Sequence, residues 1–112
     1  MKIAISSTGK NLTDNVSEIF ARCPYFVIVE VENGKIKKTE VRENKIADQL
    51  GGAGISAARL MAEKDVKAVI TGNVGPRALE VLNQFQIGIY DGDGTVEKVL
   101  QEFIQEKLEK KN

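Results

Sequence analysis

The sequence predicts an α/β fold with a mixed sheet of five strands, about three helices, an antiparallel hairpin and further parallel strands. Asn33 and Gly34 lie between strand-like runs at 25–32 and 35–42, and this dipeptide favours a type I′ hairpin turn. Residues 68–71 are apolar and mostly β-branched, which is typical of a strand covered on both faces. Helical patterns flank this run, and helical crossovers join strands that are parallel.

The residues before the hairpin predict one strand and one short helical turn. Residues 2–6 (KIAIS) form an apolar strand, and a polar loop follows them. Val16, Ile19 and Phe20 are spaced as on a helix, so we expect a helical turn at 14–20.

The two hairpin strands differ in character. The first run is nearly all apolar and should be central, whereas the lysines of the second run suit the edge of a sheet. Ile36 and Val41 in the second run have opposite parities along the strand. This mismatch predicts a β-bulge near Lys38 or Thr39.

The residues after the hairpin predict three helices and one further strand besides 68–71. Residues 43–52 form a long connection without periodicity, and such loops are usually mobile or functional. Apolar side chains at helical spacing predict helices at 53–64, 76–86 and 95–109, with a short strand at 87–90. The helices should cover both faces of the sheet. The side chains expected in the core are Ile55, Ala58, Leu60, Met61 and Ala62, then Ala78, Leu79, Leu82 and Phe85, and finally Val96, Val99, Leu100, Phe103, Ile104 and Leu108.

The composition indicates one domain, residues 1–112, of an ordinary soluble protein. Lys plus Arg and Asp plus Glu number 16 each, so there is no basic excess for binding nucleic acid or a membrane surface. No stretch approaches the roughly 20 apolar residues that span a bilayer, and the expected location is cytoplasmic. The single cysteine excludes an intrachain disulfide, and with no histidine it also excludes a closed zinc site within one chain.

Two glycine-rich loops each precede a predicted helix. Their candidate site residues are Gly51, Gly52 and Gly54 in the first loop, and Gly72, Asn73, Gly75 and Arg77 in the second. A helix N-terminus offers unpaired N–H groups and a partial positive charge, so both loops are candidate sites for an anionic ligand. The arginine could add a charge-assisted contact. Neither loop has a nucleotide-phosphate fingerprint, and the alternative is that the glycines only provide tight turns and close packing.

Five segments together resemble the dinitrogenase iron–molybdenum cofactor biosynthesis family, which includes NifX-type carriers and NifB C-terminal-domain-like proteins. They are MKIAIS, SEIFARCPYFVIVEVENGKI, GGAGISAARLM, AVITGNVGPRALEVL and GTVEKVLQEF, and they cover nearly the whole chain. The resemblance implies a ribonuclease-H-like fold of five strands and three main helices. It also implies binding, rather than turnover, of an iron–sulfur or iron–molybdenum precursor cluster. The family often has the segment SEHFGR, where this chain has Ile19 in place of histidine and Ala21 in place of glycine.

Cys23 is the only soft metal ligand, and under this resemblance its thiolate would join the cluster. One cysteine cannot hold a cluster alone, so a second copy or a scaffold protein would have to complete the ligand shell. The alternative is that Cys23 is a small, semi-buried core side chain. Asp91 and Asp93 lack the further oxygen ligands of a calcium loop and are expected in a turn.

The leading hypothesis is a small cytoplasmic, non-catalytic carrier of a cluster precursor, or a homologue of such carriers, with Cys23 and the glycine loops as its site. Its partners would be the cluster or a cluster-assembly protein, and the chain would be monomeric or weakly dimeric. Catalysis is unsupported, because the strand at 2–6 has no acidic residue for two-metal chemistry and the chain has no histidine base. The alternatives are a cofactor-free protein-interaction module on the same fold and, with less support, an enzyme for a small anionic substrate.

Overall fold

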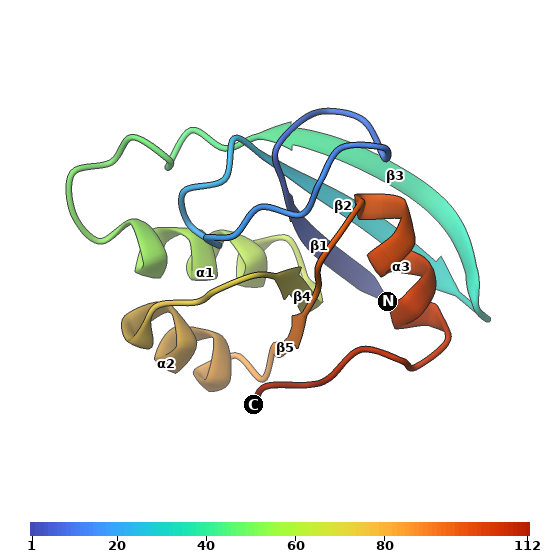
Figure 1. Ribbon diagram of the computed structural model, residues 1–112. Coiled ribbons are helices and arrows are strands. Elements are labelled where there is room, and N and C mark those ends of the chain that lie inside the picture. Colours follow the sequence, from blue (N-terminus) through green and yellow to red (C-terminus); the bar gives the residue numbers. More distant parts are fainter.

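The computed structural model describes residues 1–112 and confirms the predicted fold class (Figure 1). One open, mixed sheet contains five strands in the order β3-β2-β1-β4-β5. The strands are β1 (Lys2–Ser7), β2 (Tyr25–Glu32), β3 (Lys35–Glu43), β4 (Val66–Thr71) and β5 (Gly88–Asp91). The helices are α1 (Ala53–Glu63), α2 (Pro76–Gln84) and α3 (Val96–Ile104).

The pairing of the strands agrees with the predicted hairpin and crossovers. β1 lies at the centre, antiparallel to β2 and parallel to β4, and β4 is parallel to β5. β2 and β3 form the antiparallel hairpin, with β3 at the edge. Asn33 and Gly34 have φ angles of 53° and 75°, as a type I′ turn requires.

The hairpin contains the predicted bulge, one residue before the expected place. Glu30 pairs with Lys38 and Val31 pairs with Ile36, so Lys37 is the extra residue in β3. Beyond the bulge, the side chains of β3 change face relative to a regular alternation. This shift brings Ile36 to the same face as Val41, which resolves their opposite parities in the sequence.

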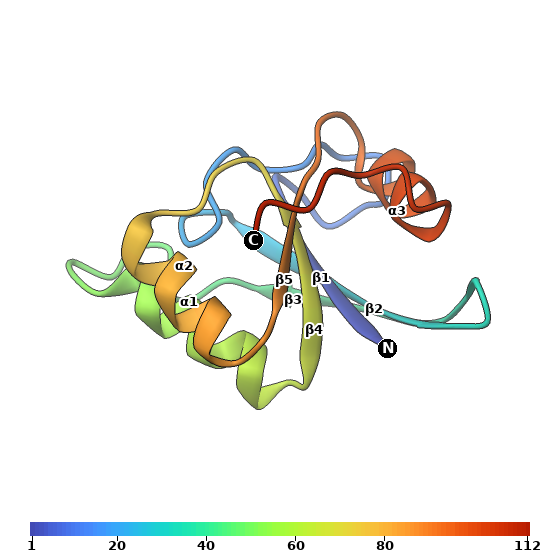
Figure 2. The same cartoon turned by 90° about the horizontal axis from the view of Figure 1, so that it is seen from below.

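Helices cover both faces of the sheet, as Figure 2 shows: α1 and α2 lie on one side and α3 lies on the other. Val69 of β4 points into the core beneath α1 and α2, whereas Ala68 and Ile70 point into the core beneath α3. The run at 68–71 is therefore an inner strand covered on both faces, as its composition predicts. Within α1, Ala58 and Met61 are buried, and Ile55 is only half-buried.

The predicted helical turn at 14–20 is wrong. This segment is extended in part, and Val16 forms a bridge with Ser7 while Ile19 forms one with Asn73. The backbone N–H groups that a helix would use internally bond to neighbouring segments instead; that of Ser17, for example, donates to the Ser6 carbonyl at 2.8 Å. Tertiary pairing outweighs the local spacing of apolar residues here.

The predicted helix at 95–109 is too long, because α3 ends at Ile104 and the backbone of Glu106 has a φ of 60°. The following residues run antiparallel to β5, where the Lys111 N–H donates to the Ile89 carbonyl at 2.7 Å. The predicted core position of Phe85 is also wrong. This residue is the C-cap of α2, and its side chain is 50% exposed.

None of the three helices combines the length and the apolar character needed to cross a membrane.

Candidate functional site

The two glycine loops meet at one pocket beyond the carboxyl end of β4, between the N-termini of α1 and α2. The pocket has a volume of about 350 Å³ and is lined by residues 19–22, 52–55, 73 and 75–78. In open α/β sheets, ligands bind in crevices at this end of the strands. Five of the predicted site residues line the pocket: Gly52, Gly54, Asn73, Gly75 and Arg77. Cys23, Gly51 and Gly72 are not part of the lining.

One wall of the pocket is formed by residues 19–22, which lie alongside the end of β4. The Asn73 N–H donates to the Glu18 carbonyl at 2.6 Å, and the Phe20 N–H donates to the Asn73 carbonyl at 3.0 Å. A Cβ at Gly72 would lie 2.7 Å from the Cα of Glu18, so only glycine allows this close approach. Gly72 therefore contributes to the site by letting the wall reach the second glycine loop.

The N-termini of α1 and α2 both reach the pocket without side-chain caps. Neither N-cap, Gly52 or Gly75, provides a capping side chain, and neither helix has an acidic residue in its first turn. By contrast, the hydroxyl of Thr95 caps α3 on the other side of the sheet, and Glu97 lies in that helix's first turn. The pocket thus carries the partial positive charge of two helix dipoles, with no acidic residue in the first turn of either helix to offset it.

Several first-turn N–H groups at the pocket have no acceptor within the chain. They belong to Ala53, Gly54 and Ile55 of α1 and to Arg77 and Ala78 of α2. The first internal bonds of the two helices come from the next residues along the chain, which donate to the N-cap carbonyls. These free N–H groups can donate hydrogen bonds to an anionic ligand or to water.

The remaining glycines of the site have different local roles. Gly52 has a φ of 70°, which disfavours other residues, and a Cβ at Gly54 would lie 3.0 Å from the Cβ of Ala78, where α1 and α2 pack closely. Gly51 and Gly75 have open space around them, so a side chain would fit at either position. A side chain at Gly75 would enter a pocket-lining position.

Two arginines and no carboxylate line the pocket. Arg77 is exposed and takes part in none of the salt bridges of the chain. Arg22 donates from Nη1 to the carbonyls of Ala47 and Gln49, both at 2.7 Å, so it holds the long loop before α1 in place. Both guanidinium groups add positive charge to a surface that already carries two helix N-termini.

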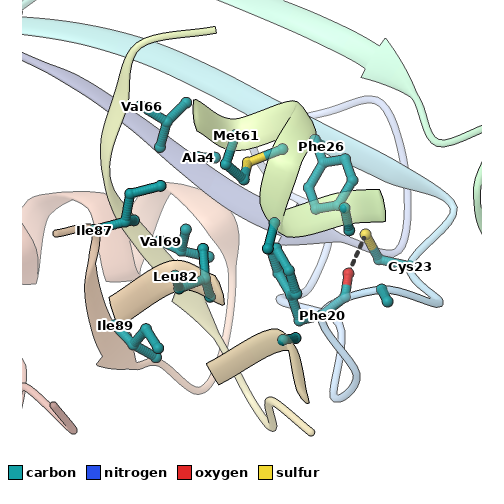
Figure 3. Packing of buried hydrophobic residues seen from close by; sticks show 14 of the residues in the cluster. Ala4, Phe20, Cys23, Phe26, Met61, Val66, Val69, Leu82, Ile87 and Ile89 are labelled. Atoms are coloured by element: carbon teal, nitrogen blue, oxygen red, sulfur yellow. Dashed lines mark hydrogen bonds between the residues drawn. The ribbon is translucent and has the colours of Figure 1, made fainter. Parts of the chain in front are cut away.

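The thiol of Cys23 is buried behind this wall, with 0% of the residue exposed. Its Sγ donates a hydrogen bond to the Phe20 carbonyl at 3.2 Å (Figure 3), and Asn44 Nδ2 lies 3.8 Å away. Burial raises the pKa of the Cys23 thiol to about 12, so the group is protonated at neutral pH. Cys23 therefore has the properties of a core side chain, and ligation of a metal by its sulfur would require residues 20–23 to open.

Asn44 joins the wall to the loop that follows β3. Its buried side-chain nitrogen donates to the carbonyls of Ala21 and Cys23, at 3.0 and 2.8 Å, and its side-chain oxygen accepts from the Ile46 N–H at 3.0 Å. Together with Arg22, this residue ties the connection at 43–52 to the pocket wall. The long loop is thus anchored to the candidate site.

A larger hollow of about 460 Å³ lies on the α3 side of the sheet, and six of its eight lining residues are hydrophobic. None of the predicted site residues contributes to it. No group of three or more His, Cys, Asp or Glu side chains in the chain is arranged to hold a metal ion. The pocket between α1 and α2 is therefore the place where the predicted residues and the positive charge coincide.

Arg22 and the rest of the wall were not predicted from the sequence as pocket residues. The segment SEIFAR was part of the family resemblance. Its Ile19 lines the pocket with 54% of its surface exposed, at the position where the family often has histidine. That departure from the family pattern was the available signal. The pairing of this segment with Asn73 joins residues far apart in the chain and has no local sequence signature.

The protein is thus of the open α/β class, with a cationic pocket at the strand ends. Comparison with known proteins assigns its family. The family model described as "Dinitrogenase iron-molybdenum cofactor" matches residues 1–106. The chain belongs to this family. A protein of Methanocaldococcus jannaschii, described as uncharacterised, is 38% identical over 111 residues, which are 98% of this chain and 91% of the relative.

Two solved structures are similar over nearly their whole length. The apo form of the orange protein from Desulfovibrio gigas has a TM-score of 0.89 and 28% identity, with 98% of this chain and 92% of that chain covered. An NMR structure of a candidate NifB protein from Thermotoga has a TM-score of 0.82 and 37% identity, with 97% and 91% covered. The family and these neighbours suggest a role in binding or carrying a cofactor.

Proposed function

We propose that this chain is a small, non-catalytic carrier of an iron–sulfur or iron–molybdenum precursor cluster, which it holds in the pocket between α1 and α2. The observation that carries the proposal is the meeting of two uncapped helix N-termini and two arginines, without a carboxylate, in one pocket of a member of the dinitrogenase iron–molybdenum cofactor family. Such a pocket favours an anionic ligand. Sulfide-rich clusters with thiolate or sulfide ligands are commonly anionic.

In this proposal the cluster is cargo that the chain holds mainly through backbone N–H groups and charge. The free N–H groups of Gly54 and Ala78 would donate to the cluster's outer atoms, and Arg77 would add a charge-assisted contact. Gly52 and Gly75 are the N-caps of the two helices, and Gly72 lets the pocket wall approach the second glycine loop. Non-covalent holding of this kind suits a carrier, because the cargo can be released without breaking a protein–metal bond.

Cys23 remains a predicted ligand only for a state in which the pocket wall opens. Its buried, protonated thiol favours a structural role in the closed state. We therefore expect the cargo to bind without a bond to this sulfur.

Binding rather than turnover is supported by the residues of the pocket. The lining contains no carboxylate, cysteine or tyrosine, and the chain has no histidine. An acid–base pair or an activated nucleophile is therefore missing from the site.

Anaerobic reconstitution with ferrous iron and sulfide, with and without molybdate, tests the proposal. We expect new charge-transfer absorption that remains with the protein during gel filtration, is weakened in Arg77→Glu and is kept in Cys23→Ala. Arg59→Glu is the matched control, because Arg59 is exposed on α1 and does not line the pocket. Protein that never acquires the absorption would contradict the carrier function, and loss of the absorption only in Cys23→Ala would instead support a thiolate-bound cluster.

A second candidate function is a cofactor-free protein-interaction module. Ile19 favours it, because this apolar side chain is 54% exposed at the pocket, where the family often has a histidine. A stable complex between the metal-free chain and a cluster-assembly protein, weakened by Ile19→Asp, would support this function. Binding of such a protein only after reconstitution would count against it.

A further inference from the structure

Strand β3 leaves one long edge of the sheet without a neighbour. The strand has nine residues, Lys35–Glu43, and Figure 1 shows it on the outside of the sheet, with only β2 beside it. Unpaired N–H and carbonyl groups along such an edge can pair with a strand of another chain.

The hydrogen bonds of β2 define which backbone groups of β3 face outward. The Val31 N–H donates to the Met1 carbonyl at 2.8 Å, so the odd-numbered residues of β2 bond to β1 and the even-numbered ones bond to β3. Glu30 and Ile28 are opposite Lys38 and Glu40, whose backbone groups therefore face β2. By alternation, the N–H and carbonyl of Thr39 and Val41 point to the open edge.

The bulge at Lys37 adds Ile36 to this outward set. Ile36, Thr39 and Val41 are opposite Val31, Val29 and Val27 of β2, so their side chains share the sheet face that carries α3. Ile36 and Val41 are each 41% exposed, which is high for large apolar side chains. The edge thus presents outward backbone groups together with a short apolar strip.

We propose that two copies of this chain associate through β3, antiparallel, about a two-fold axis at Thr39, so that two five-stranded sheets become continuous. In this arrangement Thr39 lies opposite the partner's Thr39, and the two exchange backbone hydrogen bonds. Because of the bulge, Ile36 then lies opposite the partner's Val41, and each covers the other's exposed surface.

Charge complementarity favours this register over the two neighbouring ones. Lys38 and Glu40 flank Thr39, so Lys38 lies opposite the partner's Glu40, and the symmetry repeats this opposite-charge pair. An axis at Lys38 would place two lysines opposite each other, and an axis at Glu40 would do the same with two glutamates. At the ends of the interface, Lys35 lies opposite the partner's Arg42, and this like-charge pair makes the association weak and reversible.

The interface is independent of the proposed carrier function. No residue of β3 lines the pocket between α1 and α2, so both pockets remain open in the pair. The dimer can therefore be tested on metal-free protein.

Sedimentation equilibrium over a series of loading concentrations measures the association. We expect a reversible monomer–dimer equilibrium that is lost in Thr39→Pro and kept in Thr39→Val. Proline removes the outward N–H but none of the bonds to β2, and edge strands accept it where the N–H faces solvent. A circular dichroism melt checks that both variants fold. Wild-type protein that stays monomeric up to near-millimolar concentration would overturn the proposal and leave the edge to a strand of another protein. A dimer that persists in Thr39→Pro would place the interface elsewhere.

Charge reversal tests the register itself. Lys38→Glu and Glu40→Lys each turn the opposite-charge pairs into like-charge pairs, so each variant alone should dimerise about tenfold more weakly or worse. Mixed together, the two variants restore opposite charges at every such position and should form a heterodimer. Failure of the mixture to associate, while wild type dimerises, would overturn the register.

Discussion

Arg77 is the residue whose charge is most available to a ligand at the pocket. It is exposed, lies one residue into α2 and takes part in no salt bridge, whereas Arg22 is occupied with the carbonyls of the loop before α1. Removing Arg77 should therefore change ligand binding with little effect on folding, and removing Arg22 should affect both. This difference separates a binding role from a structural role within one pocket.

Cys23 is expected to react slowly with thiol reagents. It should also make the free energy of unfolding fall as the pH rises in the alkaline range. Burial raises its pKa from 9.0 to about 12, so the unfolded chain loses this proton first as the pH rises. The contribution of the buried, neutral thiol to the free energy of unfolding is complete below pH 9.0. It is lost progressively up to about pH 12, by an amount on the order of 4 kcal/mol.

Denaturant titrations at several alkaline pH values check this expectation. The free energy of unfolding should fall less steeply with pH in Cys23→Ala than in wild type, because the variant lacks the buried thiol. Rapid modification of the native thiol at pH 7 by a thiol reagent would contradict the burial of Cys23.

Gly72 and Gly75 provide a matched pair for separating packing from binding. A Cβ at Gly72 would lie 2.7 Å from the backbone of Glu18, so Gly72→Ala should lower the free energy of unfolding by about 1–3 kcal/mol. Gly75 has open space, and Gly75→Ala should change stability much less. Chemical denaturation measures both, and equal losses would mean that the wall does not pack on Gly72 in solution.

At the scale of elements, α1 and α2 differ from α3 in how their N-termini are satisfied. α3 carries its own cap in Thr95, whereas α1 and α2 begin at glycines and open onto the pocket. A capping side chain normally stabilises a helix, so α1 and α2 are less stable with glycine caps than they would be with capping side chains. A ligand in the pocket could supply the missing contacts to their N-termini.

Gly75→Asp should therefore stabilise the protein and weaken ligand binding. The backbone of Gly75 is extended, with φ −68° and ψ 160°, which an N-cap aspartate can adopt. We expect a gain of about a few tenths of a kcal/mol from the cap and the dipole. The same carboxylate would place negative charge at the pocket, so reconstitution should yield less bound iron than in wild type, measured by iron content after gel filtration. Unchanged iron content would mean that the ligand does not bind at the N-terminus of α2.

The elements that sequence predicts correctly are those with local signals. The Asn33-Gly34 turn, the inner strand β4 and the glycine starts of α1 and α2 each depend on residues adjacent in the chain. The predictions at 14–20 and 95–109 failed because both segments bond to strands distant in sequence, and local periodicity carries no information about such bonds. For the same reason the glycine loops could be recognised from the sequence, whereas the wall beside them could not. The burial of Cys23 agrees with the alternative that its residue type offered, a small core side chain.

At the scale of the whole molecule, the sheet separates two surfaces with different properties. The pocket opens on the α1 and α2 side, where positive charge gathers although the net charge of the chain is zero. The larger, mainly hydrophobic hollow and the apolar strip of β3 are on the α3 side. An anionic cargo would thus be attracted by the positive potential of the pocket and not by a generally basic surface. Such a local potential favours selective binding.

An anionic cluster is proposed to bind between the N-termini of α1 and α2. Amide ¹H–¹⁵N spectra of the protein before and after anaerobic reconstitution with iron and sulfide test it most directly. We predict that the shifted or paramagnetically broadened signals centre on residues 52–55, 73 and 75–78, and that the hairpin and α3 keep their signals. Changes centred on the hydrophobic hollow beneath α3, or no changes in a protein that has bound iron, would contradict the account.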